Sequence, residues 1–370
     1  MDMEKNRRLG DLITRLIAKT DLAPAEAADA FQMILKNEVT DMQQGAFLAA
    51  LTAKGETAAE VAAGWRAVYT LDTEKISLGG MSLVDNCGTG MDSFKTFNIS
   101  TAASLVAAAG GVTIARHGAR AITSVCGTVD LAEALGVDME CPVDIVARSI
   151  ETAGIGLFNG MSPRVHPLAL GRILSRICFG SPLNIAASLA NPARPTTAVR
   201  GVYTPALLRP VAEVMQTIGY TDAIVLYGAI EDSAAGMDEA SVCGPTTAIH
   251  LIDGTFSELA LTPESAGLAH HDPAAIAADP DRHSAAVNMV RLLAGKGHPA
   301  RQAATILNSA LIFYVKKMVA TIPEGVARAA DILQSGRALE RLAQWVAAQN
   351  RAPAGGRQKL DDLKKEAGVL

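Results

Sequence analysis

The chain has 370 residues, of which 49% are hydrophobic and 19% are charged, so it can bury a sizeable core and has room for two domains. The formal net charge is −5 and there is no basic run, which argues against nucleic acid as a main partner. A polyanionic substrate must therefore be held locally, by backbone amides, a few cations or a metal ion.

Cysteine usage and the N-terminus both indicate a cytoplasmic protein. There are five cysteines and no pair has Cys-x-x-Cys spacing, which favours free thiols over a disulfide framework or a zinc ribbon. The first residues are largely charged, unlike a secretory signal, and the longest apolar stretch, 105–115, is too short to cross a bilayer. We therefore expect no membrane partner.

Residues 9–75 have the periodicity of amphipathic helices, and Thr57 and Glu60 have the spacing of a capping box. We predict a bundle of about four short helices. This bundle would form a small N-terminal helical domain over 1–78, joined by part of 164–190.

From Gly79 onward, strands alternate with helices. We predict strands at 81–85, 112–115, 223–227 and 247–251, and helices at 100–109, 129–135, 207–218 and within 284–349. Alternation of this kind implies a larger α/β domain, here 79–350, with a mainly parallel central sheet flanked by helices. The Gly- and charge-rich segment 351–370 is predicted to be a charged C-terminal tail, either a frayed helix or disordered.

A glycine-bearing loop follows the first predicted strand. Gly88 and Gly90 allow a tight turn that brings backbone N–H groups close to a ligand, and residues 98–101 open a helix whose N-terminus attracts anions. Open α/β folds bind ligands at the carboxyl ends of such strands. The alternative is a tight turn with an ordinary helix cap. Neither the dinucleotide fingerprint nor a P-loop is present, since Ser93 replaces the last glycine of the former and no Gly-Lys-Ser/Thr follows.

A second polar segment follows the next predicted strand. Arg116, His117 and Gly118 supply a cation, an imidazole and a flexible glycine at what should be the same sheet edge, and small hydroxyl residues follow up to Asp130. Two strand ends with complementary anion-binding groups make a phosphate site a stronger hypothesis than either segment alone.

The combination of these motifs resembles the anthranilate phosphoribosyltransferases, which share a fold with pyrimidine nucleoside phosphorylases. The matching motifs are Gly88-Thr89-Gly90-Met91-Asp92, Thr96, Asn98-Ile99-Ser100-Thr101, Arg116-His117-Gly118, the segment 124–130, His166-Pro167, Asn191-Pro192-Ala193, Met237-Asp238-Glu239 and Gly244-Pro245-Thr246. The resemblance implies transfer of 5-phosphoribosyl from phosphoribosyl pyrophosphate (PRPP) to the amine of anthranilate or a related aromatic amine, a step of tryptophan biosynthesis, by a homodimer joined through its helical domains.

The resemblance also implies which residues bind the donor. The expected PRPP-binding residues are Gly88, Thr89, Gly90, Met91, Asp92, Thr96, Asn98, Ile99, Ser100, Thr101, Arg116, His117, Gly118, Ser124 and Thr128. Of these, Arg116 and Asp92 are the expected catalytic residues. Ser100, Asp238 and Glu239 are the expected ligands of Mg²⁺, which prefers hard oxygen ligands. Without the resemblance, an adjacent Asp-Glu pair is more typical of a solvated turn.

The expected acceptor residues are Gly88, Ala119, His166 and Arg176. An arginine in the position of Arg176 would pair with the carboxylate of anthranilate, a role that suits the planar guanidinium. The alternatives are a surface helix residue for Arg176 and a hydrogen-bonded core histidine for His166.

Several positions depart from the family pattern. Arg116 replaces the usual lysine, Ala119 replaces the usual asparagine and Met91 replaces a glycine of the loop; Tyr227-Gly228 replaces a common His-Gly, and segment 229–236 is longer than usual. We therefore expect PRPP binding with magnesium to be kept and the preference for anthranilate to be weakened. A nucleoside phosphorylase and a non-catalytic, ligand-binding paralogue are the alternative functions.

Overall fold

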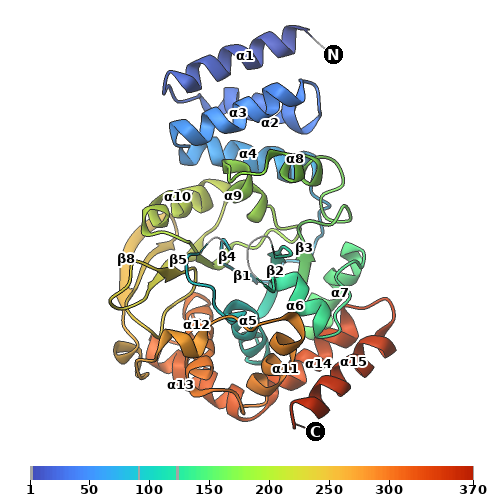
Figure 1. Ribbon diagram of the computed structural model, residues 1–370, viewed down its shortest axis with the longest axis vertical. Coiled ribbons are helices and arrows are strands. Elements are labelled where there is room, and N and C mark those ends of the chain that lie inside the picture. The colour runs from blue at the N-terminus through green and yellow to red at the C-terminus, as the bar shows by residue number, and fades with distance from the viewer. Residues whose placement is uncertain (1–2, 91, 122–124, 370) are drawn as a thin grey trace.

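The computed structural model describes residues 3–90, 92–121 and 125–369. It has a helical part, which contains the N-terminus, and a larger part built around a sheet, which contains the C-terminus (Figure 1). No helix within the described ranges is long and apolar enough to cross a membrane. All five cysteines are free, as expected.

The helical part combines the first helices with two that come later in the chain. Its elements are α1 (Met3–Ile17), α2 (Pro24–Leu35), α3 (Asp41–Lys54), α4 (Ala58–Leu71), α8 (Leu170–Ile177) and α9 (Pro182–Ser188). The predicted capping box is confirmed, because Thr57 Oγ1 accepts from the Glu60 N–H and Glu60 Oε2 accepts from the Thr57 N–H. Helix α8 is tied to the bundle by Arg172, which donates to Gln44 Oε1 at 2.9 Å.

The central sheet is mainly parallel, as predicted. Its strands are β1 (Leu83–Cys87), β2 (Thr113–Gly118), β3 (Ile155–Asn159), β4 (Thr197–Gly201), β5 (Asp222–Ala229), β6 (Gly236–Met237), β7 (Thr246–Ile252) and β8 (Thr255–Leu261). The order is β3-β2-β1-β4-β5-β7-β8, with β6 beside β5. Strands β1 to β5 run parallel, whereas β6, β7 and β8 pair antiparallel at one edge.

Both faces of the sheet are covered. The remaining helices are α5 (Ile99–Ala109), α6 (Thr128–Ala134), α7 (Val143–Ala153), α10 (Leu208–Ile218), α11 (Arg282–Leu293), α12 (Pro299–Val315), α13 (Ile322–Gln334), α14 (Arg337–Ala348) and α15 (Pro353–Glu366). Helices α5 and α12 form one hydrophobic core with one face of the sheet, and the helical part and α10 form a second core with the other face.

The strand order places a topological switch point at β1 and β4. From β1 the chain continues outward through β2 to β3, and it then returns to the other side of β1 to build β4 and β5. In open α/β sheets, ligands bind outside the carboxyl ends of strands at such a point. The site is therefore expected after Cys87 of β1 and Gly201 of β4.

The C-terminal segment is helical, which was one of the two alternatives, but it is a docked helix and not a frayed or disordered tail. Residues 353–366 form helix α15, and Leu360 and Leu363 are only 2% and 5% exposed because they pack into the main core. Two leucines three residues apart share one helix face, and the surrounding charges and glycines concealed this short apolar stripe.

Candidate active site

Two glycines bring the acidic pair against the ends of the central strands. A Cβ atom at Gly88, just after β1, would lie 2.3 Å from the Asp238 carboxylate. A Cβ atom at Gly201, the last residue of β4, would lie 1.5 Å from the Asp238 carbonyl oxygen. Because the contact at Gly201 is with backbone, a side chain there would displace Asp238, so glycine at this position permits Asp238 to lie at the switch point.

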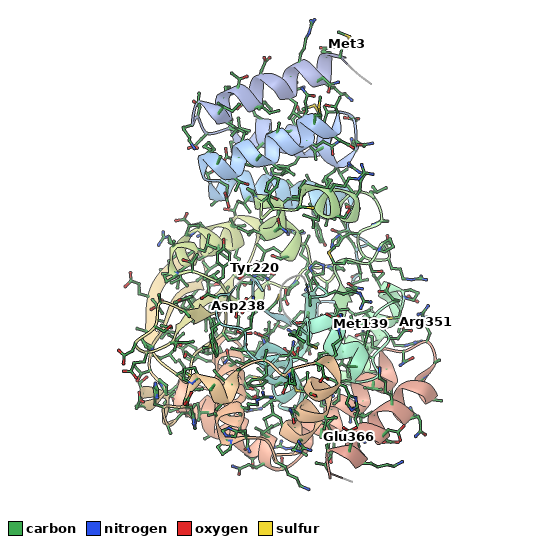
Figure 2. The ribbon with its side chains drawn as sticks, in the orientation of Figure 1. Met3, Met139, Tyr220, Asp238, Arg351 and Glu366 are labelled. Carbon is green, nitrogen blue, oxygen red and sulfur yellow. The ribbon has the colours of Figure 1, made fainter. Side chains whose placement is uncertain are left out.

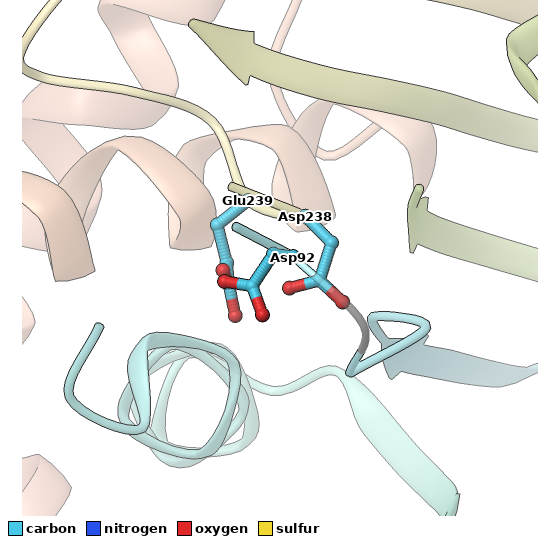
Figure 3. A group of neighbouring side chains, drawn as sticks. All are labelled: Asp92, Asp238 and Glu239. Carbon is cyan, nitrogen blue, oxygen red and sulfur yellow. The ribbon is translucent and has the colours of Figure 1, made fainter. Parts of the chain in front are cut away.

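Three carboxylates converge at this point. Asp92, Asp238 and Glu239 each offer an oxygen, and these oxygens lie within 4.8 Å of one another (Figure 3). The structure thus joins the two expected metal-binding carboxylates, as the resemblance implied. It adds Asp92, which the sequence analysis assigned to PRPP binding and catalysis rather than to the metal.

The electrostatics of the cluster favour a cation. Burial, followed by the charge of Asp238, raises the pKa of Asp92 to about 6, and Lys95, whose Nζ lies 2.9 Å from Asp92 Oδ1, offsets this in part. Burial and the two neighbouring carboxylates raise the pKa of Glu239 well above its usual range. Glu239 Oε2 is buried without a hydrogen-bond partner in the described part of the chain. Hard oxygen ligands with an unpartnered buried atom fit a magnesium ion.

Hydroxyl and amide groups of the expected donor site contact this cluster. Ser100 Oγ donates to Glu239 Oε1 at 3.2 Å, which brings together all three expected metal ligands. Thr89 Oγ1 donates to Asp238 Oδ2 at 3.3 Å, and the Gly90 N–H donates to the same oxygen. Met91 and Ser124, which were also expected to bind PRPP, lie outside the described residues.

The segment that leads into α5 has mixed roles. Asn98 is the N-cap residue, but its side chain forms no cap bond and donates instead to the Cys126 carbonyl at 3.1 Å. Ile99 is part of the main core, and Thr96 forms a β-bridge with Ala277. The amide of Asn98 therefore links this segment to the loop that precedes α6.

Arg116 is buried on the α5 side of the sheet. Its Nε donates to the Asn86 carbonyl and its Nη1 donates to Thr101 Oγ1, both at 2.8 Å. Burial lowers its pKa. Through these hydrogen bonds Arg116 holds Thr101 and the end of β1 in place. Arg116 and Thr101, which were both expected to contact PRPP, therefore contact each other in this structure.

His117 points to the opposite face, because successive side chains of a strand alternate. Its Nε2 lies 3.1 Å from Nε2 of His166, whose Nδ1 lies 2.7 Å from the Asp72 carbonyl oxygen. Since a carbonyl oxygen only accepts, the proton of a neutral His166 lies on Nδ1. Burial and His166 lower the pKa of His117 to about 3, so the pair is neutral. The expected acceptor residue His166 thus lies beside the donor motif.

The residues after His117 lie against the start of α6. A Cβ atom at Gly118 would be 3.3 Å from Thr128 Cγ2, and the Ala119 carbonyl accepts from the Val129 N–H at 3.3 Å. Gly118, Ala119 and Thr128, three expected site residues, are therefore neighbours at this sheet edge.

Among the described side chains, no contact links Arg176 to the other expected site residues. Its Nη1 lies 2.9 Å from Asp41 Oδ2 at the start of α3, and its side chain is 63% exposed. These surroundings fit the alternative interpretation, in which Arg176 is a surface helix residue.

One buried cation near the site escaped the sequence analysis. Arg200 lies in β4, opposite Cys87 of β1 and one residue before Gly201. The strand was not predicted, although a cation within the apolar run 197–202 was a usable signal. Asp85 of β1 is also buried, and burial raises its pKa to about 6.

A helical bundle joined to an α/β sheet, with a cluster of carboxylates at the switch point, is the architecture that comparison with known proteins assigns to the glycosyl transferases. Residues 80–339 match the glycosyl transferase family, a/b domain, and residues 10–70 match its helical bundle domain. The chain is 36% identical to the anthranilate phosphoribosyltransferase of Chloroflexus aurantiacus over 91% of this chain and 97% of the relative. It belongs to the anthranilate phosphoribosyltransferase family and is a pentosyltransferase.

Solved structures agree with this assignment. The anthranilate phosphoribosyltransferase from Thermus thermophilus is 32% identical, with a TM-score of 0.82 over 92% of this chain and 99% of that chain. The enzyme from Saccharomyces cerevisiae in complex with PRPP and Mg is 23% identical and shares the fold, with a TM-score of 0.81 over 92% of this chain and 97% of that chain.

Proposed function

We propose that this protein transfers the 5-phosphoribosyl group from PRPP to the amine of anthranilate or a related aromatic amine and releases pyrophosphate. The observation that carries the proposal is the cluster of Asp92, Asp238 and Glu239, with Ser100 beside it, at the switch point of the sheet. Membership of the family supports the reaction, and the yeast enzyme of the same fold binds PRPP and magnesium.

Asp238, Glu239 and Ser100 would hold magnesium, with Asp92 as a further candidate. When bound, magnesium neutralises the diphosphate that leaves ribose C1 and so makes it a better leaving group. Without the ion, three buried carboxylates would repel a polyanionic donor. The protein would therefore bind PRPP with magnesium rather than alone.

The glycine loop and the start of α5 would hold the phosphate groups. Gly90 and Thr89 supply an N–H and a hydroxyl at the cluster, and the first turn of α5 adds unsatisfied N–H donors at the positive end of a helix dipole. Thr128, at the start of α6, and Gly118 beside it would extend this cradle. Fixed donors of this kind stabilise charge as it develops on the leaving group.

The chemical step would need no nucleophilic side chain. The bond from ribose C1 to the diphosphate oxygen breaks, the amine nitrogen bonds to C1, and the nitrogen gives up one proton to the released pyrophosphate or to water. Charge at C1 is oxocarbenium-like in such displacements. Most of the rate would come from holding amine and ribose in line.

The acceptor would bind on the His117 side of the sheet. His166, Gly88 and Ala119 are the proposed contacts there, and Arg176 would join them only by leaving Asp41. Ala119 has no side-chain amide, so a hydrogen bond of about 0.5–1.5 kcal/mol to the acceptor is lost relative to the family pattern. We expect the preference for anthranilate to be correspondingly weaker.

Calorimetry and a turnover screen test the proposal. PRPP should bind in the presence of Mg²⁺ and bind weakly or not at all with EDTA. PRPP consumption is then measured with anthranilate, other aminobenzoates and nitrogen heterocycles. Cleavage of a nucleoside by phosphate, without need for PRPP, would identify a phosphorylase instead. Binding of PRPP with no turnover of any amine would identify a non-catalytic paralogue.

A further inference from the structure

Arg200 is a buried cation with too few partners. The side chain is 2% exposed, yet its Nε and Nη1 atoms have no hydrogen-bond partner among the residues that the structure describes. Its Nη2 donates to the hydroxyl of Ser188 at the end of α9. A guanidinium has five N–H donors and is always charged, so burial with one neutral partner is unfavourable unless an anion completes the site.

Two other arginines have an unpartnered Nε but differ from Arg200. Arg328 and Arg341 are only partly buried, and each donates to a backbone carbonyl, of Gly110 and of Ala153, at 2.8 and 2.7 Å. In Arg200 two of the three nitrogens lack partners in the described structure and the whole side chain is enclosed.

The surroundings of Arg200 belong to the site. It pairs in register with Cys87, directly before the glycine loop, and the next residue, Gly201, lies against Asp238. Arg200 and His117 both contact Ser188, through its hydroxyl and its carbonyl oxygen respectively, so they point to the same face of the sheet.

Under the proposed function, this face is opposite to the one on which the donor would bind. The groups proposed to hold phosphates lie at the glycine loop and at α5, whereas Arg200 and His117 lie under α9 on the side of the helical part. An anionic group that reaches Arg200 therefore belongs to the second substrate. Tyr220 lies near the boundary of the two parts of the molecule (Figure 2). Burial raises the pKa of Tyr220 and the charge of Arg200 lowers it in part, so Arg200 acts in the same region.

Asp85, a buried carboxylate close to Arg200, does not complete the hydrogen bonding of the guanidinium. Asp85 feels the charge of Arg200, which lowers its pKa against the larger effect of burial, but Asp85 Oδ1 also lacks a partner in the described structure. Asp85 Oδ2 accepts instead from Asn191 Nδ2 at 3.3 Å. The two groups are thus close enough to interact and yet do not satisfy each other.

We propose that Arg200 binds the carboxylate of the acceptor amine and makes the enzyme select amines that carry an acidic group. This inference rests on the proposed function, since it concerns the acceptor of that reaction. The carboxylate would replace the hydroxyl of Ser188 as the partner of the guanidinium. Arg200 acts as a specificity-determining residue, and Arg176 can keep its ion pair with Asp41.

Steady-state kinetics with matched acceptors test the role of Arg200. Wild type, Arg200→Met and Arg200→Lys are compared on anthranilate and its methyl ester at saturating PRPP and Mg²⁺. We expect Arg200→Met to raise the KM for anthranilate roughly 10- to 100-fold and to abolish the preference for the acid over the ester. The KM for PRPP should stay within about 2-fold, and Arg200→Lys should keep part of the preference.

Control variants separate binding from folding. Arg328→Met removes a comparable arginine far from α9 and should leave both KM values unchanged. A preference for the acid that survives in Arg200→Met, or one that is lost in Arg176→Met instead, would overturn the proposal. A purely structural role for Arg200 would also overturn the proposal. It would be recognised if Arg200→Met lowered the melting temperature, if adding Asp85→Asn restored it, and if the preference for the acid over the ester were unaffected in both variants.

Failure of the proposed function gives a different result. If wild type turns over no amine with PRPP, binding of anthranilate and of benzoate is measured by calorimetry. Binding to wild type that Arg200→Met weakens at least 10-fold supports the role of Arg200, and equal or absent binding overturns it.

Discussion

Glu239 shows how the folded protein keeps a carboxyl group in surroundings that disfavour its charge. It is buried beside two carboxylates and has one unpartnered oxygen within the described chain. Glu239→Gln keeps an oxygen for Ser100 but removes the charge. We expect calorimetric binding of PRPP with Mg²⁺ to be lost and kcat/KM to fall ~100-fold or more, while the metal-free protein melts a few degrees higher.

The matched control is Glu258→Gln, which removes an exposed carboxylate from β8 and should change neither PRPP binding nor the melting temperature. A Glu239→Gln protein that binds PRPP normally would show that this carboxylate does not hold magnesium. A lower melting temperature would show that its charge is satisfied in the free protein.

The raised pKa of Asp92 predicts a pH-dependent effect of magnesium. A carboxyl whose pKa is near 6 when folded and near 3.8 when unfolded stabilises the protein fully below about pH 4 and loses that contribution as pH rises through 6. The loss is at most about 3 kcal/mol. Since Mg²⁺ competes with protons, it should raise the melting temperature clearly at pH 7.5 and little at pH 5.

Thermal unfolding with and without Mg²⁺ at the two pH values measures this effect. In Asp92→Asn the fall in metal-free stability between pH 4 and 6 should be smaller, because one of the shifted carboxyls is gone. Equal stabilisation by Mg²⁺ at pH 5 and 7.5 would contradict the prediction.

Local motifs made part of the site predictable at the level of residues. Asp238, Glu239 and Ser100 meet as the resemblance implied, and Thr89 and Gly90 lie with them. What the chain alone did not reveal depends on contacts between distant segments. The partner of a buried cation such as Arg200 is set by the sheet register and by the helix above it, and neither is visible in the local sequence.

Helix α15 gives a test at the scale of an element. Leu363→Ala should lower the free energy of unfolding by about 2–4 kcal/mol, because a buried leucine that packs into the main core leaves a cavity when truncated. Urea denaturation measures the change. Lys365→Ala, an exposed neighbour on the same helix, should change it by less than about 0.5 kcal/mol. Equal effects would mean that α15 is not docked.

The elements that were predicted are those with strong periodicity or clear boundary signals. Helices α4 and α5 and strands β1 and β2 have caps, glycines or apolar runs at their ends, and the structure contains them. Strands β3 and β4 were missed because each is five residues long and buried along its whole length. Such strands show no alternation, so only the assembled sheet distinguishes them from other short apolar runs.

The two parts of the molecule are joined around the site. Trp65 of α4 donates to the Leu189 carbonyl at 2.9 Å, just after α9, and the Glu74 N–H donates to the Val165 carbonyl at 2.9 Å. The segment with His166, α8 and α9 thus leaves the sheet, packs on the bundle and returns to it (Figure 1). An acceptor bound beneath α9 would contact both parts, so its binding would depend on how they sit together.

The exposed apolar residues of the helical part predict its role in assembly. Ile17 at the end of α1 and Met42 at the start of α3 are 68% and 83% exposed. We propose that the bundle forms a homodimer, in which such side chains are covered. Each fully covered side chain contributes about 1.5–3 kcal/mol, and a buried carboxylate in its place opposes association.

The double variant Ile17→Glu/Met42→Glu should therefore be monomeric by light scattering after gel filtration. Met81→Glu, which changes an exposed methionine outside the bundle, should remain dimeric, and a monomeric wild type would refute the assignment.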